Sequence, residues 1–218
     1  MSDASAKHPS LAFWDERYAA PGFAYGTTPN HWLEARAGDI RPGGRVLSLG
    51  EGEGRNAVWL AEQGFSVDAV DASAVGLEKA RELADRRGVR LRTLVDDLAT
   101  YRPEFNAYDA LVLVFVHLPP NIRSLVHAAG ARALRPGGVL IIEAFTHLQL
   151  GRPSGGPRQA DLLYEVATVR SDFPGVDWLV LEEAEVELDE GPFHRGTAAV
   201  VRGVGKAGTD LSRRSNES

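Results

Sequence analysis

Residues 46–57 read Val-Leu-Ser-Leu-Gly-Glu-Gly-Glu-Gly-Arg-Asn-Ala, and this stretch decides the fold. A short apolar run leads directly into glycines at positions 50, 52 and 54, and a helix-forming segment, residues 55–63, follows and ends at Gly64. Glycine at alternate positions lets the backbone turn sharply and approach a ligand closely, and the start of a helix offers unpaired N–H groups. The stretch therefore predicts a strand, a ligand-binding loop and a helix, in that order.

The same alternation of apolar strands and helix-like segments continues as far as residue 144. Strands alternating with helices of about 10–15 residues indicate βαβ units and a doubly wound, mostly parallel α/β sheet. We expect strands at residues 45–49, 65–70, 91–95, 110–116 and 139–144, and helices at residues 55–63, 73–87 and 122–134.

The two ends of the chain depart from this pattern. After a helix-like stretch at 161–171, two strand-like runs, 178–188 and 196–204, are joined by Asp189-Glu-Gly-Pro192, which predicts an antiparallel hairpin at one edge of the sheet. Two helix-like stretches precede the first strand. We therefore expect one domain with three parts: an N-terminal helical cap at residues 1–42, the α/β part at residues 43–204 and a disordered polar tail at residues 205–218.

Composition excludes several classes of protein. The chain has 218 residues, 44% of them apolar, and a formal net charge of −6, so we expect no nucleic-acid or membrane-surface partner. The longest apolar run is far shorter than the roughly 18 residues that span a bilayer, and no signal peptide is evident, which predicts a cytoplasmic protein. The absence of cysteine excludes disulfides, and the histidines lack metal-ligand spacing, so we expect no metal site.

An acidic residue follows each of the next two predicted strands. Asp71 ends the second strand, 17 residues after Gly54, where its carboxylate can accept hydrogen bonds from both hydroxyls of a ribose. Asp97 follows the third strand and can accept from an adenine amine, while Leu98 covers the base. Together with the glycine loop, these residues indicate a nucleotide-like ligand.

The spacing of the glycines disfavours a dinucleotide. The fingerprint G-x-G-x-x-G/A needs a third small residue where Arg55 stands. Glu51 and Glu53 would also repel a pyrophosphate, whereas they tolerate the ammonium group of an amino-acid tail. An NAD(P)-dependent oxidoreductase is therefore an alternative, and not the favoured hypothesis.

These motifs resemble those of class I S-adenosylmethionine-dependent methyltransferases. The resemblance rests on the glycine loop, Val70-Asp71, Asp97-Leu98, Tyr108-Asp109 and the turn at residues 134–140, and it implies a seven-stranded sheet and S-adenosylmethionine as cofactor. It implies that the cofactor-binding residues are Tyr25, Gly50, Glu51, Gly52, Gly54, Asn56, Asp71, Ala72, Asp97, Leu98 and Phe115. Ser48 stands where the family usually has an acid, and Glu51 or Glu53 is the candidate to replace it.

Within this superfamily the chain resembles the tellurite-resistance and thiopurine type of methyltransferase. The resemblance lies in Phe13-Trp-Asp-Glu-Arg-Tyr18, in the glycine loop, and in Leu188-Asp-Glu-Gly-Pro-Phe-His194-Arg195. It implies a small acceptor (a thiol, a thiopurine-like compound or a tellurite- or selenite-type chalcogen compound) and in-line transfer of the methyl group. The candidate catalytic residues are His117, His194 and Arg195: the arginine would supply positive charge, and the histidines a hydrogen-bond donor or a weak base.

Alternatives stay open for two of the histidines and for the chain as a whole. His117 can instead finish a buried strand with its ring bonded to a backbone carbonyl, and His194 can be a surface turn residue. The whole chain can be a non-catalytic scaffold that binds S-adenosylmethionine, since fold does not imply function. The protein is expected to be a monomer or a homodimer.

Overall fold

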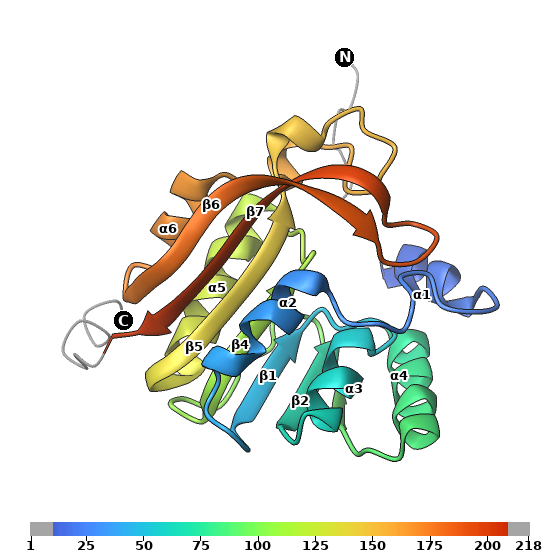
Figure 1. Cartoon of the computed structure of the whole chain (residues 1–218), viewed down its shortest axis with the longest axis horizontal. Helices are drawn as coiled ribbons and strands as arrows, with labels where there is room; N and C mark the ends of the chain where they lie inside the picture. The colour runs from blue at the N-terminus through green and yellow to red at the C-terminus, as the bar shows by residue number, and fades with distance from the viewer. Residues whose placement is uncertain (1–10, 209–218) are drawn as a thin grey trace.

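A computed structural model describes residues 11–208. These residues form one seven-stranded sheet with the order β3-β2-β1-β4-β5-β7-β6 (Figure 1). The strands are β1 (Arg45–Leu49), β2 (Ser66–Asp71), β3 (Arg92–Val95), β4 (Tyr108–Val114), β5 (Leu134–Phe145), β6 (Val176–Asp189) and β7 (Arg195–Ala207). The first five run parallel, whereas β7 is antiparallel to both β5 and β6. The predicted doubly wound α/β sheet with an antiparallel hairpin at one edge is confirmed.

Helices cover both faces of the sheet. They are α1 (Leu11–Ala19), α2 (His31–Arg36), α3 (Arg55–Glu62), α4 (Ala74–Arg87), α5 (Pro120–Ala133) and α6 (Val166–Asp172), with short 3₁₀ turns η1 (Ala37–Asp39), η2 (His147–Gln149) and η3 (Ala160–Leu162). Apolar side chains of α2, α3 and α4 share one buried cluster with the sheet, and those of α5 and α6 share another. Figure 1 shows α2 and α3 in front of the sheet and α5 behind it.

The central strand β4 is buried along its whole length. Burying a side chain such as Leu111, Val112 or Leu113 contributes about 1.5–3 kcal/mol. The strand ends at Val114, two residues before the predicted end, because Phe115 has a φ of +54° and leaves the extended conformation. The N–H of Phe115 still donates to the carbonyl of Glu143 on β5, at 2.7 Å.

The remaining differences from the predicted elements lie at their ends. The helix expected at 161–171 is divided into η3 and α6, and β7 continues to Ala207. Residues 205–207, expected in a disordered tail, therefore pair with β5 and β6. Residues 1–10 of the predicted cap and 209–218 of the predicted tail lie outside the described residues.

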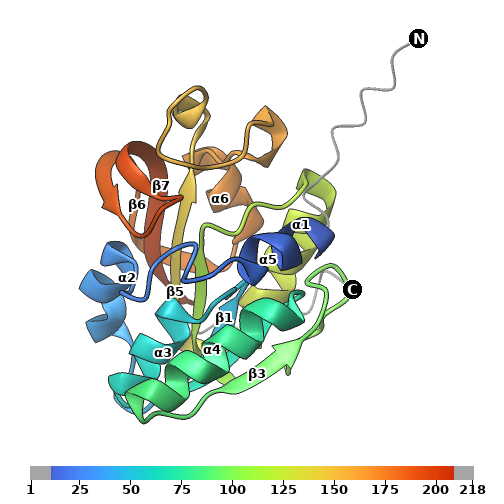
Figure 2. The ribbon, with the colours of Figure 1, turned by 90° about the vertical axis from the view of Figure 1, so that its right-hand side faces the viewer.

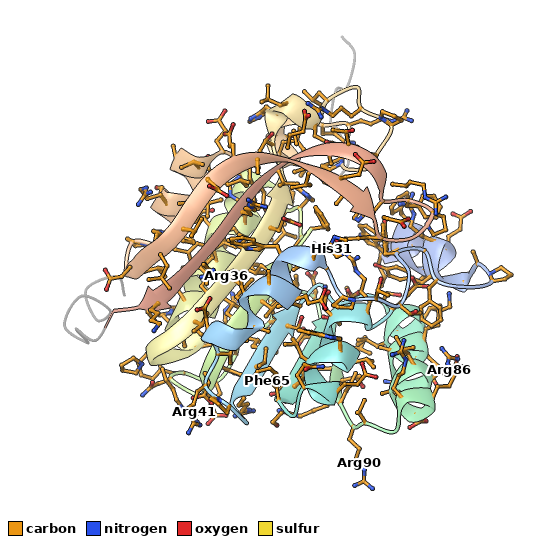
Figure 3. The ribbon with its side chains drawn as sticks, viewed as in Figure 1. His31, Arg36, Arg41, Phe65, Arg86 and Arg90 are labelled. Atoms are coloured by element: carbon orange, nitrogen blue, oxygen red, sulfur yellow. The ribbon has the colours of Figure 1, made fainter. Side chains whose placement is uncertain are left out.

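The order of the strands determines where a ligand can bind. β1 and β4 are parallel neighbours. From β1 the chain adds β2 and β3 on one side, and it then crosses to add β4 and β5 on the other side. In open α/β sheets, ligands bind outside the carboxyl ends of the strands at such a point. Figure 3 shows His31 near this edge of the sheet, and Arg41 and Arg90 at the opposite edge. Within residues 11–208, no helix is long and apolar enough to cross a membrane.

Candidate functional site: a pocket at the carboxyl ends of the parallel strands

A pocket of about 670 Å³ lies at the carboxyl ends of β1, β2 and β4. Its volume is in the range usual for a small-molecule site. One side is formed by the loops that follow the strands, and the other by α1, the segment after it, the loop after β5 and the β6–β7 turn. The lining residues used below are Trp14, Arg17, Tyr18, Tyr25, Gly50, Glu51, Arg55, Asn56, Asp71, Ala72, Asp97, Leu98, Phe115, His117, Phe145, Arg158 and His194.

The glycine loop presents bare backbone to the pocket. Gly50 has a φ of +63° and Gly52 a φ of +61°, a conformation that favours glycine. A Cβ atom on Gly50 would lie 2.8 Å from Val116 Cγ2, and one on Gly52 would lie 2.6 Å from the hydroxyl of Tyr18. Only glycine therefore fits at these two positions, where the loop packs against Val116 and Tyr18. Gly54, φ +90°, occupies the N-cap position of α3.

Glu51 lies beside Ser48, the position at which the resemblance leads us to expect an acid. Its buried carboxylate accepts hydrogen bonds from the N–H groups of Ala57 at 2.8 Å and Asn56 at 3.1 Å, and from the Ser48 hydroxyl. It thus fastens the glycine loop to the first turn of α3, where negative charge is favourable. Burial raises the pKa of Glu51.

Glu53 points to the other side of the loop. Its carboxylate pairs with Lys79 of α4 at 2.7 Å and accepts from the N–H of Ala24 at 2.7 Å. It holds the N-terminal segment to the rest of the domain. Of the two candidate replacements for the missing acid, Glu51 is therefore the one beside Ser48.

Asp71 links β2 to the glycine loop. Its two oxygens accept hydrogen bonds from the N–H groups of Gly52 and Ser73, each at 2.8 Å, and burial raises the pKa of its carboxyl. A carboxylate has about four acceptor positions, so acceptor capacity remains for a ribose hydroxyl. Ala72 lies beside it in the wall of the pocket.

Asp97 and Leu98 lie in the same pocket wall after β3. Asp97 is exposed and accepts from the N–H of Ala99 at 2.9 Å, which forms a tight turn. Asn56 lies on the opposite side, where its side-chain oxygen accepts from the N–H of Asn30 at 2.9 Å. The structure thus brings all eleven residues predicted to bind the cofactor to the pocket or, for Gly52 and Gly54, to its loop.

His117 is held by the backbone through both ring nitrogens. Nδ1 lies 2.7 Å from the carbonyl of Leu162, and Nε2 accepts from the N–H of Phe145 at 3.3 Å. Burial lowers the pKa of His117 to about 4, so the ring is neutral at physiological pH. Because neither nitrogen is left for proton transfer, the arrangement corresponds to the structural alternative for this residue.

His194 lies inside an aromatic enclosure although it belongs to a turn. Its ring centroid is 4.5 Å from those of Tyr25 and Phe115 and 5.3 Å from that of Phe145. The residue is buried, and its Nδ1 atom has no hydrogen-bond partner among the described residues. Burial, together with the positive charge of Arg55, lowers the pKa of His194 well below its usual value. His194 thus places a neutral ring in the wall of the pocket, and its unpartnered Nδ1 atom is buried.

Arg195 does not join this group. It is exposed, pairs with Asp189 at 3.2 Å and lies outside the pocket lining. The prediction that it brings positive charge to the acceptor is not supported by this position. The arginines that line the pocket are instead Arg17, Arg55 and Arg158, three residues that sequence reasoning missed.

The segment before β1 closes the pocket. Trp14, Arg17 and Tyr18 of α1 line it, and Arg17 donates to the hydroxyl of Tyr25 at 2.8 Å. α1 lies beside the first turn of α4, where Ser73 donates to Asp15 at 2.5 Å (Figure 2). The aromatic stripe of α1 therefore faces the pocket, and only Tyr18 among its members is fully buried.

The match to known sequences agrees with this geometry. Residues 46–138, which contain the glycine loop, Asp71 and Asp97, match the family described as a methyltransferase domain. This part of the chain is therefore similar to methyltransferase domains. Ribosomal protein L11 methyltransferase of Thermus thermophilus is 37% identical over 126 residues, which cover 54% of this chain and 46% of that protein. The chain spans about half the length of the curated relatives it matches.

Solved structures share the fold over most of the chain. A protein studied in the conversion of a disulfide bond into a thioacetal group during echinomycin biosynthesis superposes with a TM-score of 0.73 and 20% identity, covering 93% of this chain and 92% of that one. TehB from Haemophilus influenzae superposes with a TM-score of 0.67 and 17% identity, covering 90% and 66%. At these identities the likeness concerns the fold.

The pocket fits S-adenosylmethionine, the cofactor of this domain. Gly50 brings backbone without a side chain to the pocket wall beside Glu51, and Asp71 offers acceptor capacity at the next strand end. Asp97 and Leu98 lie farther along the same wall. When bound, the cofactor supplies an electrophilic methyl group on a sulfonium.

Proposed function

We propose that this protein transfers a methyl group from S-adenosylmethionine to a small acceptor with a soft nucleophilic atom, such as a thiol, a thiopurine-like compound or a tellurite- or selenite-type oxyanion. The observation that carries the proposal is the aromatic enclosure of His194 beneath the N-terminal segment. The segment and the β6–β7 turn cover the pocket, which leaves room for a small molecule.

The charges that line the pocket are divided between its two sides. Carboxylates occupy the side of the parallel strands, at Glu51, Asp71 and Asp97. Arg17 and Arg158 lie on the opposite side, and within residues 11–208 neither forms an ion pair with a carboxylate. Arg17 is held over the rings of Phe13 and Phe193, at 4.6 and 4.3 Å. This division favours an acceptor that is anionic when it reacts, as a thiolate or a chalcogen oxyanion is.

The chain contributes alignment, exclusion of water and control of one proton. Phe115 and Phe145, stacked at 4.5 Å, would restrict a flat acceptor to one orientation, which favours in-line displacement. Covering the site excludes water as a competing nucleophile. A thiol acceptor that arrives protonated can give its proton to the neutral ring of His194, so that its sulfur forms the new bond as a thiolate. His117 holds the end of β5 through its two backbone hydrogen bonds.

Calorimetry and an acceptor screen test the proposal. The protein is titrated with S-adenosylmethionine, S-adenosylhomocysteine and NAD, and methyl transfer is then measured with thiophenol, 6-mercaptopurine, tellurite and ribosomal protein as acceptors. We expect binding of the first two ligands only, and transfer to at least one small acceptor. Transfer to ribosomal protein alone would overturn the small-molecule acceptor. Binding with no transfer to any acceptor would favour the scaffold.

A further inference from the structure

A cluster of four buried polar side chains lies beside the pocket and is not used by the proposed reaction. We call it the Glu190 cluster: Asn30, Arg55, Glu143 and Glu190. Arg55 Nη1 lies 2.6 Å from one carboxylate oxygen of Glu190. The side-chain amide of Asn30 donates to the other Glu190 oxygen at 2.9 Å and to Glu143 at 2.7 Å. The four residues come from the segment before α2, the start of α3, the end of β5 and the β6–β7 turn.

Stability does not explain this cluster. The side chains of Arg55 and Glu190 are 8% and 1% exposed, so both charges have left water. A buried ion pair is often no more stable than apolar residues of the same volume, because desolvation offsets the attraction. Two carboxylates that share one amide donor add repulsion. A buried polar group retained at such cost is best explained by the geometry that it imposes.

The geometry that Glu190 imposes is that of the turn carrying His194. The N–H of Glu190 donates to the carbonyl of His194 at 2.8 Å, and the N–H of His194 donates to the carbonyl of Gly191 at 3.3 Å. Gly191 lies against the backbone of Gly26, where a Cβ atom would be 2.4 Å from the Gly26 nitrogen. Figure 1 shows this turn close to α1 and the segment that follows it.

Arg55 connects the same turn to the cofactor side of the pocket. It is the first residue of α3, directly after Gly54, and it also lines the pocket. The second anchor is the start of α2, where the N–H of His31 (labelled in Figure 3) lies 3.4 Å from Glu190 Oε1. The turn is thus tied by one carboxylate to the helix behind the glycine loop and to the N-terminal segment.

We propose that Glu190 is a positioning residue: by binding Arg55 and Asn30, it sets the His194 ring at a fixed place relative to the glycine loop. This inference rests on the proposed function for its catalytic consequence, but its structural content concerns residues of this chain alone. A hairpin turn at the edge of a sheet is otherwise among the more mobile parts of a protein. Glu190 removes that freedom where the acceptor must be aligned.

Nuclear magnetic resonance of protein labelled with ¹³C-histidine tests the inference without any cofactor. The His194 signal, assigned with His194→Gln, is titrated in the wild type and in Glu190→Gln. We expect the variant to lose the ring-current shift from Tyr25 and Phe115, and the pKa of His194 to rise toward its ordinary value of about 6.5. The groups that face His194 are Arg55, Arg17, His117 and Tyr25.

The direction of this change separates positioning from simple electrostatics. Removing the negative charge of Glu190 leaves Arg55 uncompensated, which by itself would lower the pKa of His194 further. A rise therefore requires the ring to leave its enclosure. His127, buried between α5 and α6, is the internal reference, and Glu187→Gln on the exposed face of β6 is the matched control. An unmoved His194 signal, or an equal change at His127, would overturn the inference.

A double-mutant cycle gives the second readout, with thiophenol as acceptor. We expect Glu190→Gln to lower kcat about 10- to 100-fold. In a His194→Ala background it should have little further effect, because it acts through that ring. Independent, multiplying effects would contradict the inference. If Glu190→Gln does not fold, Glu190→Asp keeps the charge and shortens the reach. Absence of methyl transfer in the wild type would count against the proposed function and leave the resonance result intact.

Discussion

The two sides of the pocket are built in different ways. The side that holds the glycine loop, Asp71 and Asp97 comes from three successive strand ends, and its hydrogen bonds join residues close in sequence, such as Glu51 and Ala57. The side that holds His194 comes from three segments far apart in sequence: α1 with the segment after it, the loop after β5, and the β6–β7 turn. The salt bridge that ties this turn to the cofactor side joins Arg55 and Glu190, which are 135 residues apart. Local construction suits a ligand common to many proteins, whereas a site assembled from distant loops can change its acceptor while the sheet stays the same.

The largest expected effect is a loss of cofactor affinity caused by a substitution on the cofactor side alone. Asp71→Ala removes the acceptor of the Gly52 N–H as well as the groups proposed to bind the ribose. Hydrogen bonds to charged groups contribute about 1.5–3 kcal/mol each, so affinity for S-adenosylmethionine should fall by at least about 100-fold in calorimetry. Asp96→Ala, one strand away and outside the pocket lining, is the control and should bind as the wild type does. Unchanged affinity in Asp71→Ala would remove the cofactor from this place.

The next effect separates cofactor affinity, expected from one side of the pocket, from turnover, expected from the other. His194→Ala should leave the affinity for S-adenosylmethionine within about threefold and lower kcat about 100-fold, since a positioned base contributes about 10²–10⁴. Binding is measured by calorimetry and turnover with an acceptor that the screen identifies. A large loss of cofactor affinity with unchanged turnover would show that His194 belongs to the cofactor side instead.

The third prediction concerns how the stability of the protein depends on pH through Glu143, which is buried beneath the acceptor side. Burial raises the pKa of Glu143 from its usual range near 4.5 to about 7, so folding favours the protonated carboxyl. A raised carboxyl pKa means that the stabilising contribution is complete below about 4.5 and is lost as pH rises through about 7. Glu143→Gln removes this titration and can still accept from Asn30. The variant should therefore gain about 3 kcal/mol over the wild type between pH 4.5 and 7, measured by urea unfolding.

That stability difference should be flat above about pH 7.5. Buried His117 acts in the opposite direction, since its lowered pKa costs stability as pH falls below about 6.5, but it contributes equally to both proteins. A gap between variant and wild type that does not depend on pH would mean that Glu143 is ionised throughout.

The smallest expected effect tests whether the positive charge of Arg17 helps to bind an anionic acceptor. Arg17→Gln should raise the KM of an anionic acceptor about tenfold and leave that of a neutral acceptor unchanged, because Arg17 lines the pocket without a carboxylate partner among residues 11–208. Arg195→Gln is the matched control, since Arg195 is exposed and outside the lining. Equal effects of the two substitutions on steady-state kinetics would argue for a general, long-range influence of charge.

How far the site can be predicted differs between these two sides. The glycine loop and the acids at strand ends follow from short-range spacing, and all eleven residues proposed for the cofactor lie at the pocket or its loop. His194 was expected from the resemblance, but its burial follows from the packing of Tyr25 and Phe115 around it. Arg195, its neighbour, is the first residue of β7, where it is exposed and pairs with Asp189 on β6.

Other features have no local signal at all. Nothing near position 17 predicts that Arg17 lines the pocket while Arg195 does not. The positive φ of Phe115 and the two backbone bonds of His117 depend on β5 and η3, which are brought close only by folding. Glu190 alone has a local signal. It is a charged residue in a turn whose shape is already explained by Gly191 and Pro192.

The sequence by itself determined the sheet, the order of its elements and the glycine loop, because hydrophobic periodicity and glycine conformation are properties of neighbouring residues. It also determined that a methyltransferase domain lies at residues 46–138. The aromatic enclosure of His194, the arginines that line the pocket and the link from Glu190 to α3 became evident only from the tertiary structure. Those outcomes depend on contacts across more than 100 residues, where the position of each side chain is set by the packing of the whole domain.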